Sequence, residues 1–174
     1  SGGLIINGNI TPNAGITATL TLTGTNADNA IGGIIYNPTS SGSLSIIKSG
    51  SGTWALSGVN TYTGATTINA GTIKVSANNN LGTGNLIFNG GTLNTTDSFS
   101  LTGRSRVYLD GNATFNVDSS TTLTVLTTIT ARSVSATFTK SGARTLVLSS
   151  ANNRWYGGSN INAGSIQLAA NNTL

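Results

Sequence analysis

The sequence contains no cysteine, histidine, methionine or glutamate among its 174 residues. Without cysteine the chain forms neither disulfides nor thiolate metal sites, and without histidine it lacks the usual base that activates a serine or cysteine nucleophile. Charge is also scarce, since 7% of the residues are charged, against about 25% in an average soluble domain. We therefore expect no catalytic residues, no metal site and no cofactor.

Long apolar runs are missing as well. Runs such as Ile34–Tyr36 are far shorter than the roughly 20 residues that span a membrane, so we expect no direct membrane insertion of this segment. No basic, hydrophobic leader opens the chain, and we expect any export signal to lie outside it. Hydrophobic residues make up 37% of the sequence and are evenly spread, which favours a folded core over disorder.

The basic excess is a weak signal. Eight lysines and arginines oppose four aspartates, but only Arg104 and Arg106 lie close together in the sequence. Proteins that bind nucleic acid usually cluster their basic residues on one face. We therefore expect no nucleic-acid partner.

Residues that alternate between apolar and polar dominate the chain. This period of two indicates strands with one buried and one exposed face. The apolar members of such pairs are Leu20 and Leu22, Trp54 and Leu56, Ile73 and Val75, Leu86 and Phe88, Val107 and Leu109, Phe115 and Val117, Leu123 and Val125, Leu146 and Leu148, and Ile166 and Leu168. Asparagine and glycine, which favour turns, stand between the pairs. The chain is predicted to be all-β.

A long internal repeat separates two all-β architectures. Lys48 matches Lys140 and Asn60 matches Asn152 at a spacing of 92, whereas Ile68 matches Ile161 at 93. One extra residue near Arg154 would reconcile the two spacings and would pair Tyr62 with Trp155. Over 48–61 and 68–81, 16 of 28 positions are identical to their counterparts. The copies span approximately 45–82 and 137–174, with a weaker echo at 19–26.

Such self-similarity is typical of stacked units that cannot bury their hydrophobic faces alone. With coils of roughly 20–25 residues, the 92-residue spacing corresponds to about four coils and the chain to about seven or eight. We therefore predict a β-solenoid rather than a meander of hairpins. Coil register stays open at this point.

The stretch KSGSGTWALSGVNTYTGATTINAGTIKV (48–75) closely resembles the passenger-associated repeat of bacterial autotransporters. Its Lys-x-Gly-x-Gly start, Asn-x-Tyr-x-Gly centre and Ala-Gly-x-Ile end carry the resemblance. In the second copy Arg144 and Ser150 replace glycines, and Trp155 stands at the tyrosine position. The resemblance implies a right-handed parallel β-helix in a large surface-displayed or secreted bacterial protein, with residues 1–174 as one solenoid segment of it.

Four aspartates are the only carboxylates among the side chains: Asp28, Asp97, Asp110 and Asp118. Glycoside hydrolysis usually needs two carboxylates that face each other. Asp110 and Asp118 flank one predicted strand, but Asp110-Gly111 is typical of a turn. A polysaccharide-cleaving enzyme is therefore the least favoured function.

Arg104, Arg106 and Tyr108 alternate and are predicted to share one strand face. This strip is the candidate site for an anionic glycan or a host surface, although charges on one exposed face also protect a strand from sideways pairing. Lys48 and Lys140 are interpreted as solvated residues of the coil. Trp54 is predicted to lie in the core, and Tyr62 and Trp155 to staple corners.

The favoured function is a structural scaffold, stalk or fibre segment at the bacterial cell surface, without catalysis. An adhesin that binds glycan or a host surface through the basic strip is the alternative. Because open solenoid ends expose unpaired strand edges, we expect head-to-tail continuation with further coils or like subunits.

Overall fold

A computed structural model describes residues 2–118 and 120–169. These residues form short strands and one 3₁₀ helix, η1 (Asn78–Leu81). The strands are β1 (Ile5–Ile6), β2 (Ala18–Leu22), β3 (Asn29–Ile31), β4 (Leu44–Lys48), β5 (Thr53–Leu56), β6 (Thr66–Ile68), β7 (Thr72–Val75), β8 (Leu86–Phe88), β9 (Thr92–Thr95), β10 (Phe99–Leu101), β11 (Val107–Leu109), β12 (Ala113–Val117), β13 (Thr122–Val125), β14 (Ile129–Ala131), β15 (Phe138–Ser141), β16 (Thr145–Leu148), β17 (Ser159–Ile161) and β18 (Ser165–Leu168).

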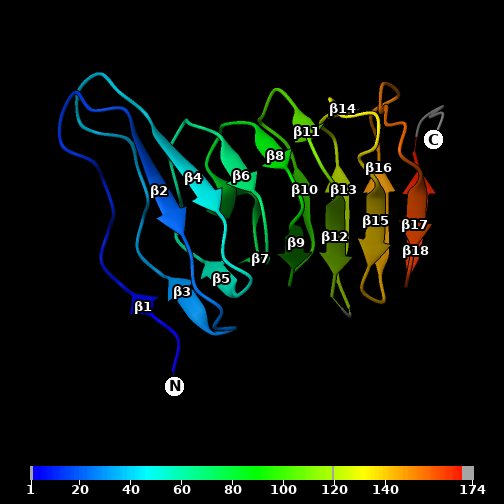
Figure 1. The fold of residues 1–174 in the computed structure, drawn as a ribbon, viewed down its shortest axis with the longest axis horizontal. Coiled ribbons are helices and arrows are strands. Elements are labelled where there is room, and N and C mark those ends of the chain that lie inside the picture. The colour runs from blue at the N-terminus through cyan, green and yellow to red at the C-terminus, as the bar shows by residue number, and fades with distance from the viewer. Residues whose placement is uncertain (1, 119, 170–174) are drawn as a thin grey trace.

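The strands form three parallel sheets that run the length of the molecule (Figure 1). The long sheet has the order β1-β3-β5-β7-β9-β12-β15-β17, the six-stranded sheet β14-β11-β8-β6-β4-β2, and the four-stranded sheet β10-β13-β16-β18. Successive strands belong to different sheets, and each strand pairs with the one that occupies the same face in the next coil. The chain is therefore a parallel β-solenoid, which confirms the predicted fold class and excludes the hairpin meander.

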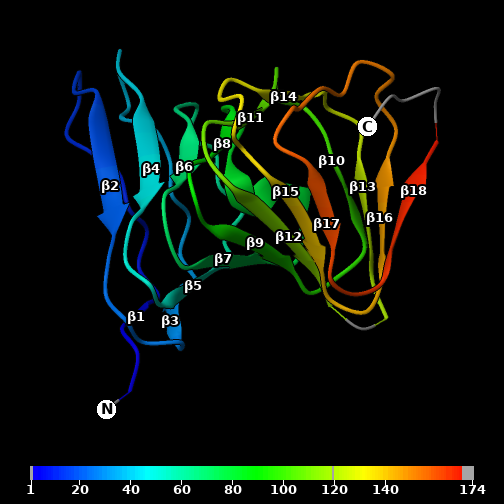
Figure 2. The same ribbon diagram turned by 45° about the vertical axis from the view of Figure 1, so that its right-hand side comes forward.

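The coils differ in length. Thr53 pairs with Thr72, 19 residues later, whereas Ala18 pairs with Leu44, 26 residues later. The third face is made of loop and of η1 in the N-terminal half, and becomes the four-stranded sheet from β10 onward (Figure 2). The expected coil length of roughly 20–25 residues thus fits most of the stack.

One hydrophobic core runs through all coils. The apolar members of the alternating pairs point inward, as in β12, where Ala113, Phe115 and Val117 are fully buried. Four aromatic rings stack along the axis, with centroid distances of 4.9 Å from Phe88 to Phe115, 5.3 Å from Phe115 to Phe138 and 4.6 Å from Phe138 to Trp155. Trp54 is also buried, as predicted, and its indole N–H donates to the Thr23 carbonyl at 2.8 Å.

Strands at the two ends of the stack leave apolar side chains exposed. Ile5 on β1 is 63% exposed and Ile161 on β17 is 54% exposed, whereas Ile68, the counterpart of Ile161, is fully buried. The difference arises because no described strand covers β17 on its outer side. An inward-facing position is buried only where another coil lies against it.

The two repeat copies occupy different faces of the solenoid. Lys48, Ile68, Phe88, Leu109 and Ala131 pair in one column of the six-stranded sheet. Lys140 lies nine residues beyond Ala131, in β15 of the long sheet. The spacing of 92 is therefore four coils plus one face, and the expected correspondence to about four coils alone is corrected. A repeat can shift by one face because its sequence encodes a corner and two alternating strands, which fit any face.

Candidate functional site

The structure separates the three residues of the predicted strip. Tyr108 faces outward from β11 and Arg106 is exposed just before that strand. Arg104 is instead 7% exposed, and its guanidinium donates to the Gly84 carbonyl at 3.1 Å and to Asn78 Oδ1 at 3.0 Å. Burial lowers the pKa of Arg104. The expectation of one exposed strip is thus corrected, because Arg104 uses its donors to clamp two loops. Whether Arg106 and Tyr108 bind a ligand stays a prediction.

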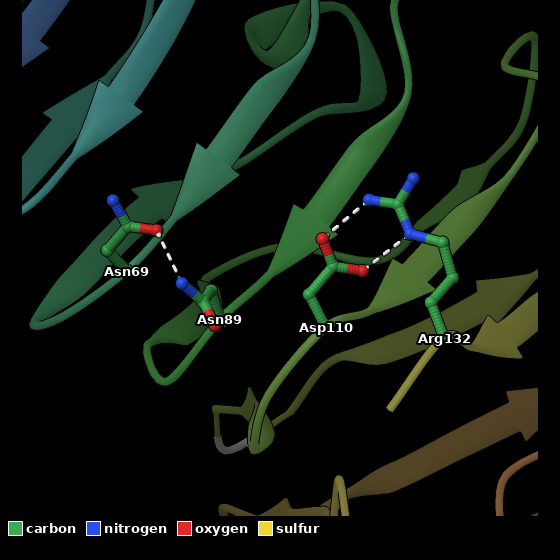
Figure 3. A network of polar contacts seen from close by, with 4 residues as sticks. All are labelled: Asn69, Asn89, Asp110 and Arg132. Carbon is green, nitrogen blue, oxygen red and sulfur yellow. Dashed lines mark hydrogen bonds and ion pairs between the residues drawn. The ribbon is translucent and has the colours of Figure 1, made fainter. Parts of the chain in front are cut away.

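Tyr108 is covered by an arginine that sequence spacing did not suggest. The Arg132 guanidinium lies 4.1 Å from the centre of the Tyr108 ring and forms two hydrogen bonds with the Asp110 carboxylate, at 2.6 and 2.5 Å. Figure 3 shows this pair at one corner of the solenoid, beside Asn69 and Asn89, whose side-chain amides lie 3.4 Å apart. Asn69, Asn89, Asp110 and Arg132 follow equivalent positions in successive coils, and backbone bonds connect each coil with the next. The four residues therefore form a polar column that closes this corner.

A groove of about 510 Å³ lies over β14 and brings together residues from three coils. Arg106 borders it on one coil, Thr128 and Thr130 lie on the next, and Arg154 borders it on the third. Asn152 also lines it. None of the residues that line the groove is acidic. Arg154 could not be found from sequence, because only the coil register places it beside Arg106.

Lys48 and Lys140 are completely buried, which corrects their interpretation as solvated residues. Lys48 Nζ donates to the carbonyls of Gly50 and Ala70, and Lys140 Nζ donates to those of Ser141, Gly142 and Ala163 at 2.5, 2.8 and 3.2 Å. Burial lowers the pKa of both amines. Each lysine ends an inward-facing row of its strand, so its amine reaches the corner and satisfies carbonyls of two successive coils.

The glycine of each Ala-Gly-x-Ile end lies beside this lysine corner. Gly71 and Gly164 have φ angles of +64° and +70°. A Cβ at either position would lie 2.3 Å from a backbone carbonyl oxygen of the preceding coil. Glycine is required here both by the left-handed backbone and by the close approach of the coils. The Lys-to-Gly spacing of the repeat thus encodes one corner.

The corner aromatics also match between the copies. Tyr62 is buried and its hydroxyl lies 2.6 Å from Thr66 Oγ1, four residues on. Trp155 is buried too, and its indole N–H donates to Ser159 Oγ at 2.8 Å, again four residues on. The prediction that these aromatics staple corners is confirmed.

The structure changes the alignment of one asparagine. Asn60 Oδ1 accepts from the Ile35 amide at 2.8 Å, and Asn153 Oδ1 accepts from the Ile129 amide at the same distance. Both asparagines are buried, whereas Asn152 is exposed. Asn60 therefore corresponds to Asn153 rather than to Asn152, and the extra residue lies before Asn153.

Asn153→Ala is expected to lower the free energy of unfolding by about 1–2 kcal/mol, because it leaves the buried Ile129 amide without an acceptor. Asn152→Ala is the matched control and should change stability by less than about 0.5 kcal/mol. Urea unfolding followed by circular dichroism measures both. An equal loss in the two variants would restore the alignment of Asn60 with Asn152.

Burial raises the pKa of Tyr62 far above its ordinary value of 10.0. The unfolded chain therefore releases the Tyr62 proton above pH 10 while the native state keeps it, so the Tyr62 contribution to stability is complete below pH 10 and is lost as pH rises further. The loss approaches about 1.4 kcal/mol per pH unit. Tyr62→Phe removes this titration, and the stability gap between wild type and variant should shrink between pH 9 and pH 11.

The remaining titratable groups cancel in that comparison, because both proteins share them. Tyr156→Phe, at an exposed tyrosine, serves as the control and should give a gap that does not change with pH. Urea titrations at pH 9, 10 and 11 supply the gaps. A constant Tyr62→Phe gap would contradict the buried, neutral Tyr62.

The carboxylates do not form an acid–base pair suited to glycoside hydrolysis. Asp110 and Asp118 lie before and after β12, whose five residues extend about 16 Å at 3.3 Å per residue. Asp110 binds Arg132, and Asp118 Oδ1 accepts from Asn94 and Asn116 at 2.8 and 3.1 Å. Glycosidase carboxylates lie about 5–10 Å apart. Within residues 2–118 and 120–169, no cluster of acidic, histidine or cysteine side chains could hold a metal. No helix in this range is long and apolar enough to cross a bilayer.

Comparison with known proteins identifies the repeats. The family described as the passenger-associated-transport-repeat matches residues 46–75 and 138–168. These are the ranges β4–β7 and β15–β18, which hold the two lysine corners. A curated relative, "Adhesin BmaC autotransporter" from Brucella suis biovar 1 (strain 1330), is 38% identical over 129 residues. The match covers 73% of this chain but only 4% of the relative. No solved structure matches the chain.

Proposed function

Since this chain belongs to the passenger-associated-transport-repeat proteins, we propose that it is a non-enzymatic β-solenoid spacer in a large bacterial surface protein. The observation that carries the proposal is the continuous core, in which the side chains serve to hold one coil on the next. Each lysine corner spends its charge on backbone carbonyls. The exposed faces carry mostly threonine, serine and asparagine, which suit an extended, soluble stalk.

Continuation of the coils is part of this proposal. β17 and β18 expose their outer edges within the described range, together with Ile161 and Leu168. Parallel strands gain hydrogen bonds when a further coil pairs with such an edge. Further coils of the same polypeptide or a like subunit would supply that pairing.

The spacer role is tested by removing one coil from the parent protein on its cell. Deletion of residues 89–109 joins Phe88 to Asp110 and keeps the register, because Phe88 pairs with Leu109. The shortened protein should remain exposed to protease added outside the cell, whereas deletion of residues 89–98 should abolish exposure. Equal loss in both would contradict a modular spacer.

The absence of enzymatic activity is tested separately, with the purified chain and acidic and neutral polysaccharides. No turnover is expected. Turnover that disappears in Asp110→Asn or Asp118→Asn would overturn this part of the proposal.

Adhesion is the second candidate function. It is supported by the name of the relative, an adhesin, and by the basic groove over β14. Binding of whole cells or of glycans to the purified chain separates it from a spacer role, since a pure spacer binds neither.

A further inference from the structure

We propose that the groove over β14 is a binding site for polysaccharides that carry carboxylate or sulfate groups. This inference goes beyond the spacer role and does not depend on it. The groove is bordered by Arg106 and Arg154, which project from sheet positions two coils apart. At about 4.8 Å per coil the two positions lie about 10 Å apart along the axis.

Both arginines have guanidinium groups that no described carboxylate neutralises. The ion pair among the described residues joins Arg132 to Asp110. Arg106 donates to the Ser105 carbonyl beside it, and Arg154 lies 5.8 Å from the centre of the Tyr156 ring. Each guanidinium therefore retains N–H donors for an incoming anion, and the guanidinium fork matches a carboxylate or sulfate well.

The surface between the arginines suits a sugar chain. Thr128 and Thr130 present hydroxyls on the middle coil, and Asn152 adds an amide at the side. Short side chains there leave the space between the two longer arginines open. Such a surface offers hydroxyl and amide partners between two cationic ends, which fits a hydroxyl-rich chain with spaced negative charges.

The same features disfavour nucleic acid and neutral sugars. Proteins that bind nucleic acid neutralise many phosphates and stack bases on aromatic rings. Here two cations line the groove, and the nearby Tyr108 ring is covered by Arg132. A neutral sugar would leave both guanidinium groups without an anionic partner.

The test measures binding by isothermal titration calorimetry with three probes: oligogalacturonate for carboxylate, heparin-derived oligosaccharide for sulfate, and dextran oligosaccharide as the neutral control. Binding to either acidic probe, weakened by added NaCl, is expected. Arg106→Gln and Arg154→Gln should each weaken it about tenfold. Arg144→Gln removes the same charge from an exposed arginine elsewhere and should change affinity less than twofold.

The arms of the experiment also distinguish the ligands. Binding to one acidic probe alone supports the proposal and selects carboxylate or sulfate. The proposal is overturned if neither acidic probe binds, if dextran binds equally well, or if a DNA oligonucleotide binds more tightly than both. It is also overturned if Arg144→Gln weakens binding as much as Arg106→Gln does. Circular dichroism confirms that each variant is folded.

Discussion

Phe115→Ala should lower the free energy of unfolding by about 3–5 kcal/mol, because a large aromatic side chain at the centre of the core is lost. Phe115 is fully buried and its ring contacts both Phe88 and Phe138. Truncation removes the apolar contacts, opens a cavity in the middle of the stack and interrupts the aromatic row. Urea unfolding followed by circular dichroism measures the loss.

Phe115→Leu is the control for this prediction. Leucine fills much of the same volume, so its cost should be clearly smaller than that of alanine. If alanine and leucine cost the same, the ring would not be packed between two neighbouring coils. A loss below about 1 kcal/mol for alanine would place Phe115 outside a closed core.

Lys48→Met should lower the free energy of unfolding by about 2–3 kcal/mol, because methionine fills the space of the lysine stem but cannot donate. The carbonyls of Gly50 and Ala70 then lose the charged donor they share. These carbonyls belong to two successive coils, so the loss should loosen the corner that closes the first repeat copy. Lys140→Met should act in the same way at the second copy.

Lys74→Met provides the matched control, because Lys74 lies on the exposed face of β7. The same substitution there should change stability by less than about 0.5 kcal/mol. Urea midpoints of the three variants give the comparison. Equal effects at Lys48 and Lys74 would mean that the buried amine contributes nothing beyond its charge.

The sequence predicted the inward residues well, because alternation has a period of two and each strand obeys it locally. Leu109, Phe115 and Leu146 were all placed correctly on that basis. It could not predict which strands share a sheet, because each alternating strand fits all three faces. The copies beginning at Lys48 and Lys140 therefore lie on different faces despite their similarity.

The polar sites were harder to predict than the core. Lys48 follows Ile46 by two residues, so alternation places it inward, and its position at the end of β4 is the signal that could have indicated burial. Arg104 precedes β11 in a bend, where alternation gives no direction. Arg132 and Arg154 come to Tyr108 and Arg106 only through the lengths of the intervening coils, which vary from 19 to 26 residues.

A repeat that encodes a corner has a structural consequence. Its lysine, its glycine and its two alternating strands form the same local structure wherever a face ends. Insertion or loss of one strand then moves later copies to the next corner without disturbing the core. The matched contacts of Tyr62 and Trp155 on different faces are an example within this chain.

The winding of the chain about one axis is tested most directly by paired cysteines, since the natural sequence has none. Thr114 on β12 pairs with Thr139 on β15, one coil later. Neighbouring strands lie about 4.8 Å apart, which a disulfide can bridge. Thr114→Cys with Thr139→Cys should therefore oxidise to an intramolecular disulfide, whereas Thr114→Cys with Thr124→Cys should stay reduced, as peptide mass spectrometry will show. Rapid closure of the second pair and none of the first would mean that β12 and β13 form a hairpin, and would contradict the solenoid.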